Sequence, residues 1–134
     1  MNDVIDLIDS SKPGVTDSDI KSAEVRLGVC FPKQYKELFK QTNNAQIAEW
    51  TLYPIKDNKN VKKTWDDIVR QNQDEREEGM AADVLTIGED GTGNKICFRI
   101  VDKAIDGKVY IWYHETAEME ELAANVKEFI VSQA

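Results

Sequence analysis

The stretch that decides the fold runs from Gly14 to Asn44 and reads GVTDSDIKSAEVRLGVCFPKQYKELFKQTNN. It predicts two helices separated by a sharp stop. Thr16 is a suitable N-cap for the first helix, because its hydroxyl can accept a hydrogen bond from an exposed backbone N–H. Gly28 predicts the end of that helix, since glycine tolerates positive φ, and Pro32 suits the first turn of the second helix. Apolar residues at helical spacing give each helix one stripe, formed by Ile20, Ala23 and Leu27 in the first and by Tyr35, Leu38, Phe39 and Thr42 in the second.

The remainder of the chain predicts strands and two further helices. A β-prone run over 50–54 closes with proline, and strands are predicted over 84–87, 96–101 and 109–113. Bulky residues on both faces of the last run indicate a central strand. The segment from Thr64 to Gln71 predicts an amphipathic helix with Trp65 on its apolar face, and the charged run from Gln73 to Gly79 follows it. The last helix is predicted to be capped by Thr116, with a buried stripe of Met119, Leu122, Ala123, Val126 and Ile130.

Two glycine-containing segments are predicted to connect the strands. The segment Gly88–Asn94, GEDGTGN, predicts a tight connection in which Gly91 or Gly93 takes positive φ. Asp106 followed by Gly107 predicts a two-residue hairpin. From the residues alone, the chain is therefore a small acidic α+β domain.

Composition limits the classes of partner. The 134 residues include 17 basic and 25 acidic side chains, a formal charge of −8. Nucleic acid is a poor partner for such a chain, because affinity there comes mainly from neutralising phosphates. A basic protein partner is more natural, although the charge could serve solubility alone. No apolar run is long enough to span a bilayer, and the start MNDVIDLIDS lacks the basic region of a signal peptide, which predicts a cytosolic protein with no membrane contact. Cys30 and Cys97 are then expected to be reduced core thiols.

No constellation of residues predicts catalysis, a metal centre or a cofactor. The segment GEDGTGNK has the glycines of a phosphate loop but lacks its GK[ST] ending and precedes a strand. Glu89, Asp90 and Asn94 offer oxygen atoms to a cation, but not at the spacing of an EF-hand. His114 is the single histidine and has no nucleophile motif beside it. We therefore expect a chain that is not an enzyme, with cation or small-molecule binding at Gly88–Asn94 as a minor alternative.

Three blocks together resemble the SUKH superfamily. The first matches a signature of the form I-x-x-x-E-x-x-L-G followed by P-x-x-Y and a terminal asparagine. The second is the turn over 87–94, and the third is the segment GKVYIWYHE at 107–115, which is similar to the family pattern G-x-V-Y-x-W-D-H-E. Tyr113 stands where the family often has Asp, and Asn44-Ala45 stands where it often has Gly-Gly. The matching positions of the first block are Ile20, Glu24, Leu27, Gly28, Val29, Phe31, Pro32, Tyr35, Leu38, Phe39 and Asn43.

The resemblance implies a fold and a function. Members have a single α+β domain, here residues 1–134, with an N-terminal helical hairpin and a C-terminal helix packed around a mainly antiparallel sheet. Most bacterial members are immunity proteins that neutralise a cognate toxin, often a nuclease, while eukaryotic relatives act as regulatory or scaffold domains. We expect a basic toxin as partner, and the sequence leaves the oligomeric state, monomer or weak dimer, open.

The candidate contact residues for such a partner are exposed carboxylates and aromatic anchors. For the tryptophans, packing in the core is the alternative interpretation. The candidates are Trp50, Tyr53, Glu75, Glu77, Glu78, Glu89, Asp90, Tyr110 and Trp112.

Overall fold

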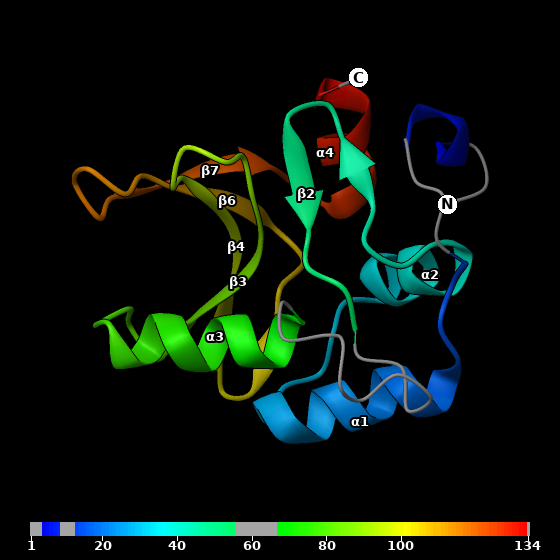
Figure 1. Ribbon diagram of the computed structural model, residues 1–134, viewed down its shortest axis with the longest axis horizontal. Helices are drawn as coiled ribbons and strands as arrows, with labels where there is room; N and C mark the ends of the chain where they lie inside the picture. The colour runs from blue at the N-terminus through cyan, green and yellow to red at the C-terminus, as the bar shows by residue number, and fades with distance from the viewer. Residues whose placement is uncertain (1–3, 9–12, 56–66, 134) are drawn as a thin grey trace.

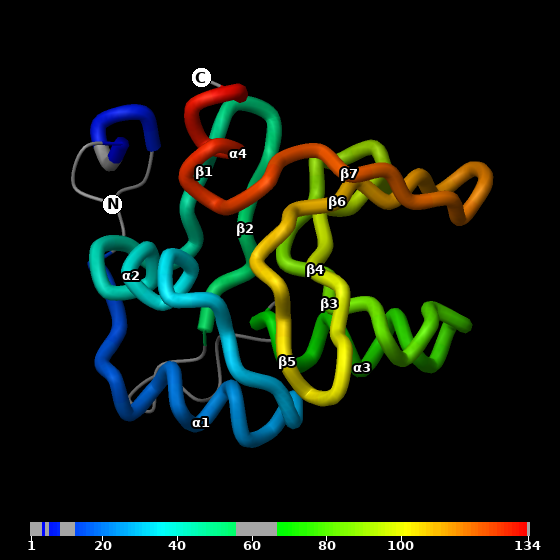
Figure 2. Tube along the Cα trace, turned by 180° about the vertical axis from the view of Figure 1, so that it is seen from behind, coloured from blue at the N-terminus to red at the C-terminus, as the bar shows by residue number. Residues whose placement is uncertain are grey.

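The computed structural model describes residues 4–8, 13–55 and 67–133. They form a single α+β domain in which helices surround a curled sheet (Figure 1, Figure 2). Residues 64–66 of the helix predicted from Thr64, among them Trp65, lie outside the described residues, and the described helix begins at Ile68 with Asp67 as its N-cap. The helices are the 3-10 turn Ile5–Leu7, α1 (Asp17–Leu27), α2 (Lys33–Gln41), α3 (Ile68–Glu77) and α4 (Val126–Gln133).

The sheet is antiparallel at every pairing between its strands. Its strand order is β1-β2-β3-β4-β6-β7, and β5 pairs with the far end of β4 beside β6. This confirms both the mainly antiparallel sheet and the central position of the strand predicted over 109–113. The strands are β1 (Gln46–Ile47), β2 (Trp50–Leu52), β3 (Val84–Glu89), β4 (Lys95–Val101), β5 (Ala104–Ile105), β6 (Val109–Trp112) and β7 (Met119–Ala123).

The connection from α1 to α2 confirms the predicted stop and restart. Thr16 accepts a hydrogen bond from the backbone N–H of Asp19 at 3.2 Å, and the Asp19 carboxylate accepts one from the Thr16 N–H at 3.2 Å, which completes a capping box. Gly28 ends α1 with φ of +71°. The buried carboxylate of Glu24 then accepts a hydrogen bond from the backbone N–H of Phe31 at 2.7 Å. A side chain of α1 therefore fixes the path by which the chain enters α2.

Tyr35 of α2 is the centre of the core on one side of the sheet. Its ring is fully buried and makes edge-to-face contacts with three aromatic rings, at centroid distances of 5.1 Å to Phe31, 4.7 Å to Phe39 and 5.0 Å to Phe98 of β4. Edge-to-face pairs add to the stabilisation that burial provides. The apolar stripe of α2 is thereby attached to the sheet.

Asn43 and Asn44 build the corner between α2 and the sheet. The Asn43 amide donates to the Ile55 carbonyl at 3.0 Å and accepts from the Ile55 N–H at 2.9 Å, so it pairs with the chain as a strand would. Asn44 adopts φ of +57°, as expected where the family often has glycine, and its amide donates to the Leu52 carbonyl at 2.7 Å. Helix α2 itself ends earlier, at Gln41.

The predicted start of the last helix is wrong. Thr116 does not cap a helix, because Met119–Ala123 form the edge strand β7 and helix α4 begins only at Val126, where Asn125 accepts from the Glu128 N–H at 2.9 Å. Val126 and Ile130 are buried in α4 as predicted, but Met119, Leu122 and Ala123 lie in a strand too short for its periodicity to distinguish it from a helix. The acidic residues Glu120 and Glu121 therefore belong to a sheet edge, which Glu118 precedes, and not to a helix start.

The predicted hairpin at Asp106-Gly107 is also wrong. Strands β5 and β6 both pair with β4 and not with each other. The two-residue turn is instead Asp102-Lys103, between β4 and β5, where φ is +52° and +67°. Asp106 caps its own loop by accepting from the Lys108 N–H at 3.0 Å. Both segments have an Asp at the first turn position, so the local sequence does not show which of them forms the hairpin turn.

The two cysteines differ in their surroundings. Cys97 is fully buried in β4, as predicted, but Cys30 is exposed. Cys30 follows the helix stop, where its neighbours Val29 and Phe31 turn inward. The expectation of two core thiols is therefore correct for Cys97 and wrong for Cys30.

Candidate functional site

The register of the strands divides the sheet into two faces. Directly opposed residues of an antiparallel pair lie on the same face of the sheet, so the strand pairings identify the residues of each face. One face packs on the aromatic core around Tyr35 through Phe98. The other face, here called the α3 face, carries Val84 and Thr86 of β3, Lys95, Cys97 and Arg99 of β4, Tyr110 and Trp112 of β6, and Met119 of β7.

Helix α3 covers only part of the α3 face. Asp67 caps the helix by accepting from the Arg70 N–H at 2.9 Å. Asn72, fully buried, then attaches the helix to β3: its amide donates to the Thr86 carbonyl at 2.9 Å and accepts from the Thr86 N–H at 2.8 Å. The strands β6 and β7 lie beyond the reach of this helix (Figure 1).

A buried cation lies under the helix. The Lys95 ammonium is 3.1 Å from the Tyr53 hydroxyl, 3.2 Å from the Glu89 carboxylate and 3.4 Å from the Glu75 carboxylate of α3. Burial alone would lower the pKa of Lys95, but these three neighbours outweigh it and hold the pKa above its ordinary value. Burial raises the pKa of Tyr53 to about 12, although Lys95 opposes the shift. Lys95 is therefore a permanent charge that joins the sheet to the helix.

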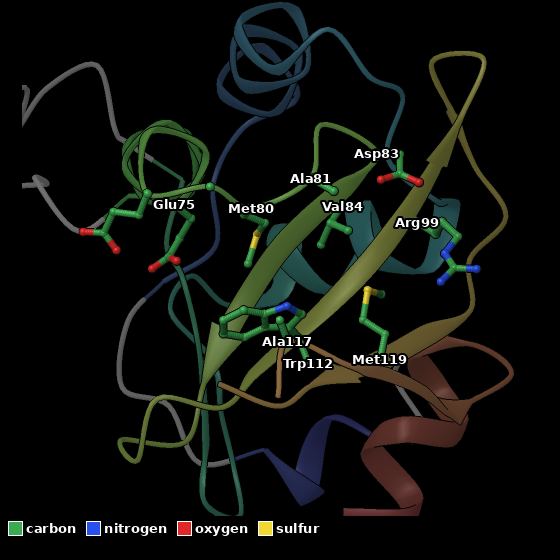
Figure 3. Close-up of a pocket in the computed structure, with 11 residues that line it drawn as sticks. Glu75, Met80, Ala81, Asp83, Val84, Arg99, Trp112, Ala117 and Met119 are labelled. Carbon is green, nitrogen blue, oxygen red and sulfur yellow. The ribbon is translucent and has the colours of Figure 1, made fainter. Parts of the chain in front are cut away.

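An open cleft lies on the rest of the α3 face. Its volume is roughly 530 Å³. Figure 3 shows the side chains that converge on it from the end of α3, the loop after that helix, and strands β3, β4, β6 and β7. Three carboxylates and one guanidinium are among them. The lining residues are Glu75, Glu78, Gly79, Met80, Ala81, Asp83, Val84, Arg99, Trp112, Ala117 and Met119.

The cleft has an acidic end and an end of mixed charge, where Asp83 lies beside Arg99. At the acidic end are Glu75 and Glu78, one turn apart on α3 and the residue that follows it. At the other end the Arg99 guanidinium lies 5.0 Å from the centre of the Tyr110 ring, within range of a cation–π interaction. Trp112 lies between them in Figure 3, with Met119 beside it. The cleft thus combines an apolar floor with two carboxylates at one end and a guanidinium beside a carboxylate at the other.

The structure brings three of the predicted contact residues together in this cleft: Glu75, Glu78 and Trp112. Tyr110 lies on the same face, under Arg99. Glu77 is exposed on α3 but does not line the cleft. These placements agree with a shared surface for the acidic helix end and the β6 aromatics.

Trp50 and Tyr53 lie in the core, which favours the packing alternative stated for the tryptophan. Their exposed fractions are 3% and 4%. The Trp50 indole N–H donates to the Gln133 side chain at 3.1 Å and so connects β2 to α4. Tyr53 donates its hydroxyl to Glu89 at 3.1 Å. Neither ring presents a face to a partner in this structure.

The loop after β3 is an internally bonded turn. Gly91 and Gly93 both have positive φ, as predicted. Asp90 accepts from the Thr92 N–H at 2.8 Å and from its hydroxyl at 2.7 Å; burial alone would raise the pKa of Asp90, but these hydrogen bonds hold it below its ordinary value. Glu89 points to Lys95 instead. Within residues 4–8, 13–55 and 67–133, no three His, Cys, Asp or Glu side chains are grouped to hold a metal ion.

Gly88 has a packing role at the start of this segment. A Cβ atom there would lie 2.7 Å from the Thr51 carbonyl oxygen of β2, where β3 changes register between Thr86 and Gly88. The glycine lets β2 approach an irregular strand closely. The glycine of the second family-like block is thereby explained by the contact between strands.

The lining residues that sequence reasoning missed include Met80, Asp83, Arg99 and Met119. Met119 was assigned to a helix, so its position opposite Trp112 could not be seen. Arg99 alternates with Cys97 and Lys95 along β4, a period-two signal that was available. The sequence does not show that β4 pairs with β6, and this pairing places Arg99 on the same face as Tyr110 and Trp112.

The fold and the cleft define a class of protein: a single α+β domain whose helices leave part of an antiparallel sheet exposed in a cleft. The profile of the SUKH_5 family, described as SMI1-KNR4 cell-wall, matches residues 1–133, so the chain belongs to this family of the SUKH superfamily. No curated protein matches the chain significantly. In the described parts of the chain, none of the helices has the length and apolar character needed to cross a membrane.

Proposed function

We propose that this chain is a non-catalytic binding module of the immunity type, which neutralises a cognate bacterial toxin. The observation that carries the proposal is the open cleft of the α3 face, where the carboxylates of Glu75 and Glu78 border the half-buried Trp112. Exposed aromatic side chains next to charges are typical of protein-binding hot spots. Membership of the SUKH superfamily agrees with this class of function.

The proposed mechanism is occlusion. The formal charge of −8 attracts a basic toxin through its long-range field and increases the rate of encounter. The cleft and the acidic residues of α3 then cover the basic surface on which a nuclease holds its substrate. Direct binding of nucleic acid is not part of the proposal, because these carboxylates would repel phosphates. The expected location is the cytosol, where an incoming toxin would act.

The experiment that tests this proposal starts from the genes on either side of this one. A toxin domain found there is produced in a sensitive bacterial host with and without this chain, and surviving colonies are counted. Survival only in the presence of the chain is expected. Full killing despite abundant folded protein contradicts the proposal.

Two charge reversals locate the interface in the same assay. Glu78→Lys places a cation at the acidic end of the cleft, whereas Glu49→Lys makes the same change of charge in the β1–β2 turn. Both residues are exposed, and neither makes an ion pair within the described residues. Loss of protection with Glu78→Lys but not with Glu49→Lys is expected.

The second candidate is a regulatory or scaffold domain that binds another cytosolic protein. The description of the matched family as SMI1-KNR4 cell-wall favours it. The same cleft would then bind a host protein in place of a toxin. The absence of any toxin gene next to this one, together with a stable complex with a protein of the same cell, would favour this candidate over the first.

A further inference from the structure

We propose that the cleft of the α3 face binds an arginine side chain of the partner, with its guanidinium group over Trp112 and against the carboxylates at the acidic end. This inference rests on the proposed function only in assuming that the partner is a protein. It identifies the chemical group that the cleft selects.

The first support is the charge at the acidic end. Within the described residues, the Glu78 carboxylate has no ion-pair partner, and Glu75 uses its Oε1 atom toward Lys95 at 3.4 Å. The second oxygen of Glu75 is therefore not used by this pair. Arg99 lies beside Asp83 at the other end, so the excess negative charge of the lining lies with Glu75 and Glu78. A cationic group complements it, whereas a carboxylate or phosphate does not.

The second support is the apolar floor. Trp112 stands opposite Lys95 of β4 on one side and opposite Met119 of β7 on the other, so two strands hold the backbone that positions its ring. In Figure 3 the indole lies between Glu75 and Met119. A guanidinium is planar and weakly hydrated, so it stacks on an aromatic ring and pairs with carboxylates at its edge. A lysine ammonium is compact and strongly hydrated, and it uses such a floor less well.

The third support is the arrangement of Arg99. This residue already lies against an aromatic ring on the same face, 5.0 Å from the centre of Tyr110. Its guanidinium lies beside Asp83 at the far end of the cleft, so that end attracts a second cation less than Glu75 and Glu78 do. The guanidinium of a partner is therefore directed toward Glu75 and Glu78, at the end where α3 closes the sheet.

The test is an NMR titration of the full chain with N-acetylarginine amide. Three matched probes are used: the arginine derivative, N-acetyllysine amide, and N-acetylcitrulline amide, which has the same shape as arginine without its charge. We expect the arginine probe to shift the indole N–H signal of Trp112 and the methyl signals of Met80 and Met119. Smaller shifts are expected with lysine and none with citrulline. Equal shifts with arginine and citrulline, or no shift at the cleft with arginine, would overturn the proposal.

Variants connect the shifts to the acidic end. Glu78→Gln is expected to weaken binding of the arginine probe about two- to fivefold, the range of an exposed ion pair. Glu49→Gln is the control and should change nothing. Both residues are exposed, so the variants are expected to fold, which their spectra report directly. Unchanged binding in Glu78→Gln would overturn the role of the carboxylates.

The titration does not need a toxin, so the two proposals fail separately. Binding of arginine without neutralisation of any toxin would leave this inference standing and contradict the immunity function. Neutralisation of a toxin by a chain whose cleft signals do not shift with arginine would support the immunity function and contradict this inference.

Discussion

The Lys95 ammonium lies 3.4 Å from the Glu75 carboxylate, and this contact joins the interior of the sheet to the acidic end of the cleft. Lys95 is 9% exposed in its side chain and Glu75 is 18% exposed. The same ammonium holds Glu89 and the Tyr53 hydroxyl. A buried charge of β4 therefore sets the position of a carboxylate that we place in the binding site.

Lys95→Met is expected to destabilise the protein by about 1–3 kcal/mol, because it leaves Glu75 and Tyr53 without their cationic partner in a largely buried setting. The half-exposed Glu89 contributes little to this loss, since water screens it. The measurement is the free energy of unfolding in urea. Lys108→Met is the matched control, because its pair with Glu121 spans 3.3 Å but is about half exposed, and it should change stability by less than about 0.5 kcal/mol. Equal effects of the two variants would contradict a role for burial.

Stability is expected to fall as the pH rises above about 10. Burial raises the pKa of Tyr53 from 10.0 to about 12, so the folded state favours the neutral phenol. That contribution is complete below the unfolded pKa and is lost as the pH rises through the folded value. The raised pKa of Lys95 acts in the same direction. A shift of this size corresponds to at most about 2–3 kcal/mol.

The measurement for this pH dependence is the urea midpoint from neutral pH to about pH 11. Tyr53→Phe should flatten the alkaline decline and lower the stability at neutral pH by about 0.5–1.5 kcal/mol, the value of one hydrogen bond. A decline that is as steep in Tyr53→Phe as in the unmodified chain would show that Tyr53 is not its source.

One of the two thiols is expected to react in the folded protein. Burial raises the pKa of Cys97 to about 12, so roughly one thiol in ten thousand is ionised near pH 8, and the side chain is out of reach of reagents. Cys30 is exposed. A thiol reagent is expected to react rapidly with one thiol of the folded protein. The second thiol should react only in denaturant. Cys30→Ser should abolish the fast phase, and a fast phase that survives this substitution would contradict the burial of Cys97.

Glu24→Ala is expected to destabilise the helical hairpin by about 1–3 kcal/mol. The substitution leaves the buried Phe31 N–H without an acceptor, which costs more than the loss of an exposed contact. Lys36→Met separates the two roles of Glu24, because Lys36 lies 3.6 Å from the carboxylate but is 40% exposed. It should cost less than about 0.5 kcal/mol in the same unfolding measurement. If Lys36→Met proved as costly as Glu24→Ala, the ion pair and not the backbone hydrogen bond would be the stabilising contact.

The sequence predicted those parts of the fold whose signals are local. The cap at Thr16, the positive φ of Gly28 and the αL conformation at Asn44 each follow from one side chain and its own backbone. The family-like positions proved structural: Glu24 holds the connection between helices, and Tyr35 centres the aromatic core. These roles explain why that stretch identifies the scaffold without containing the cleft.

The rest depended on contacts between distant segments. The Asp102-Lys103 turn and the Asp106-Gly107 loop look alike locally, and only the pairing of β5 and β6 with β4 distinguishes them. Met119–Ala123 forms a strand because it pairs with β6, and the pattern of apolar residues in so short a segment does not reveal that pairing. The cleft combines Arg99, Trp112 and Met119 from three strands, so the sequence could name Trp112 as a candidate but could not assemble the site.

The most direct test of the proposed neutralisation uses a toxin domain encoded by a gene next to this one, purified and assayed with increasing amounts of this chain. We predict that activity falls to the background at about one equivalent, and that Glu78→Lys loses this inhibition while Glu49→Lys keeps it. Full toxin activity in the presence of excess folded protein would contradict the account.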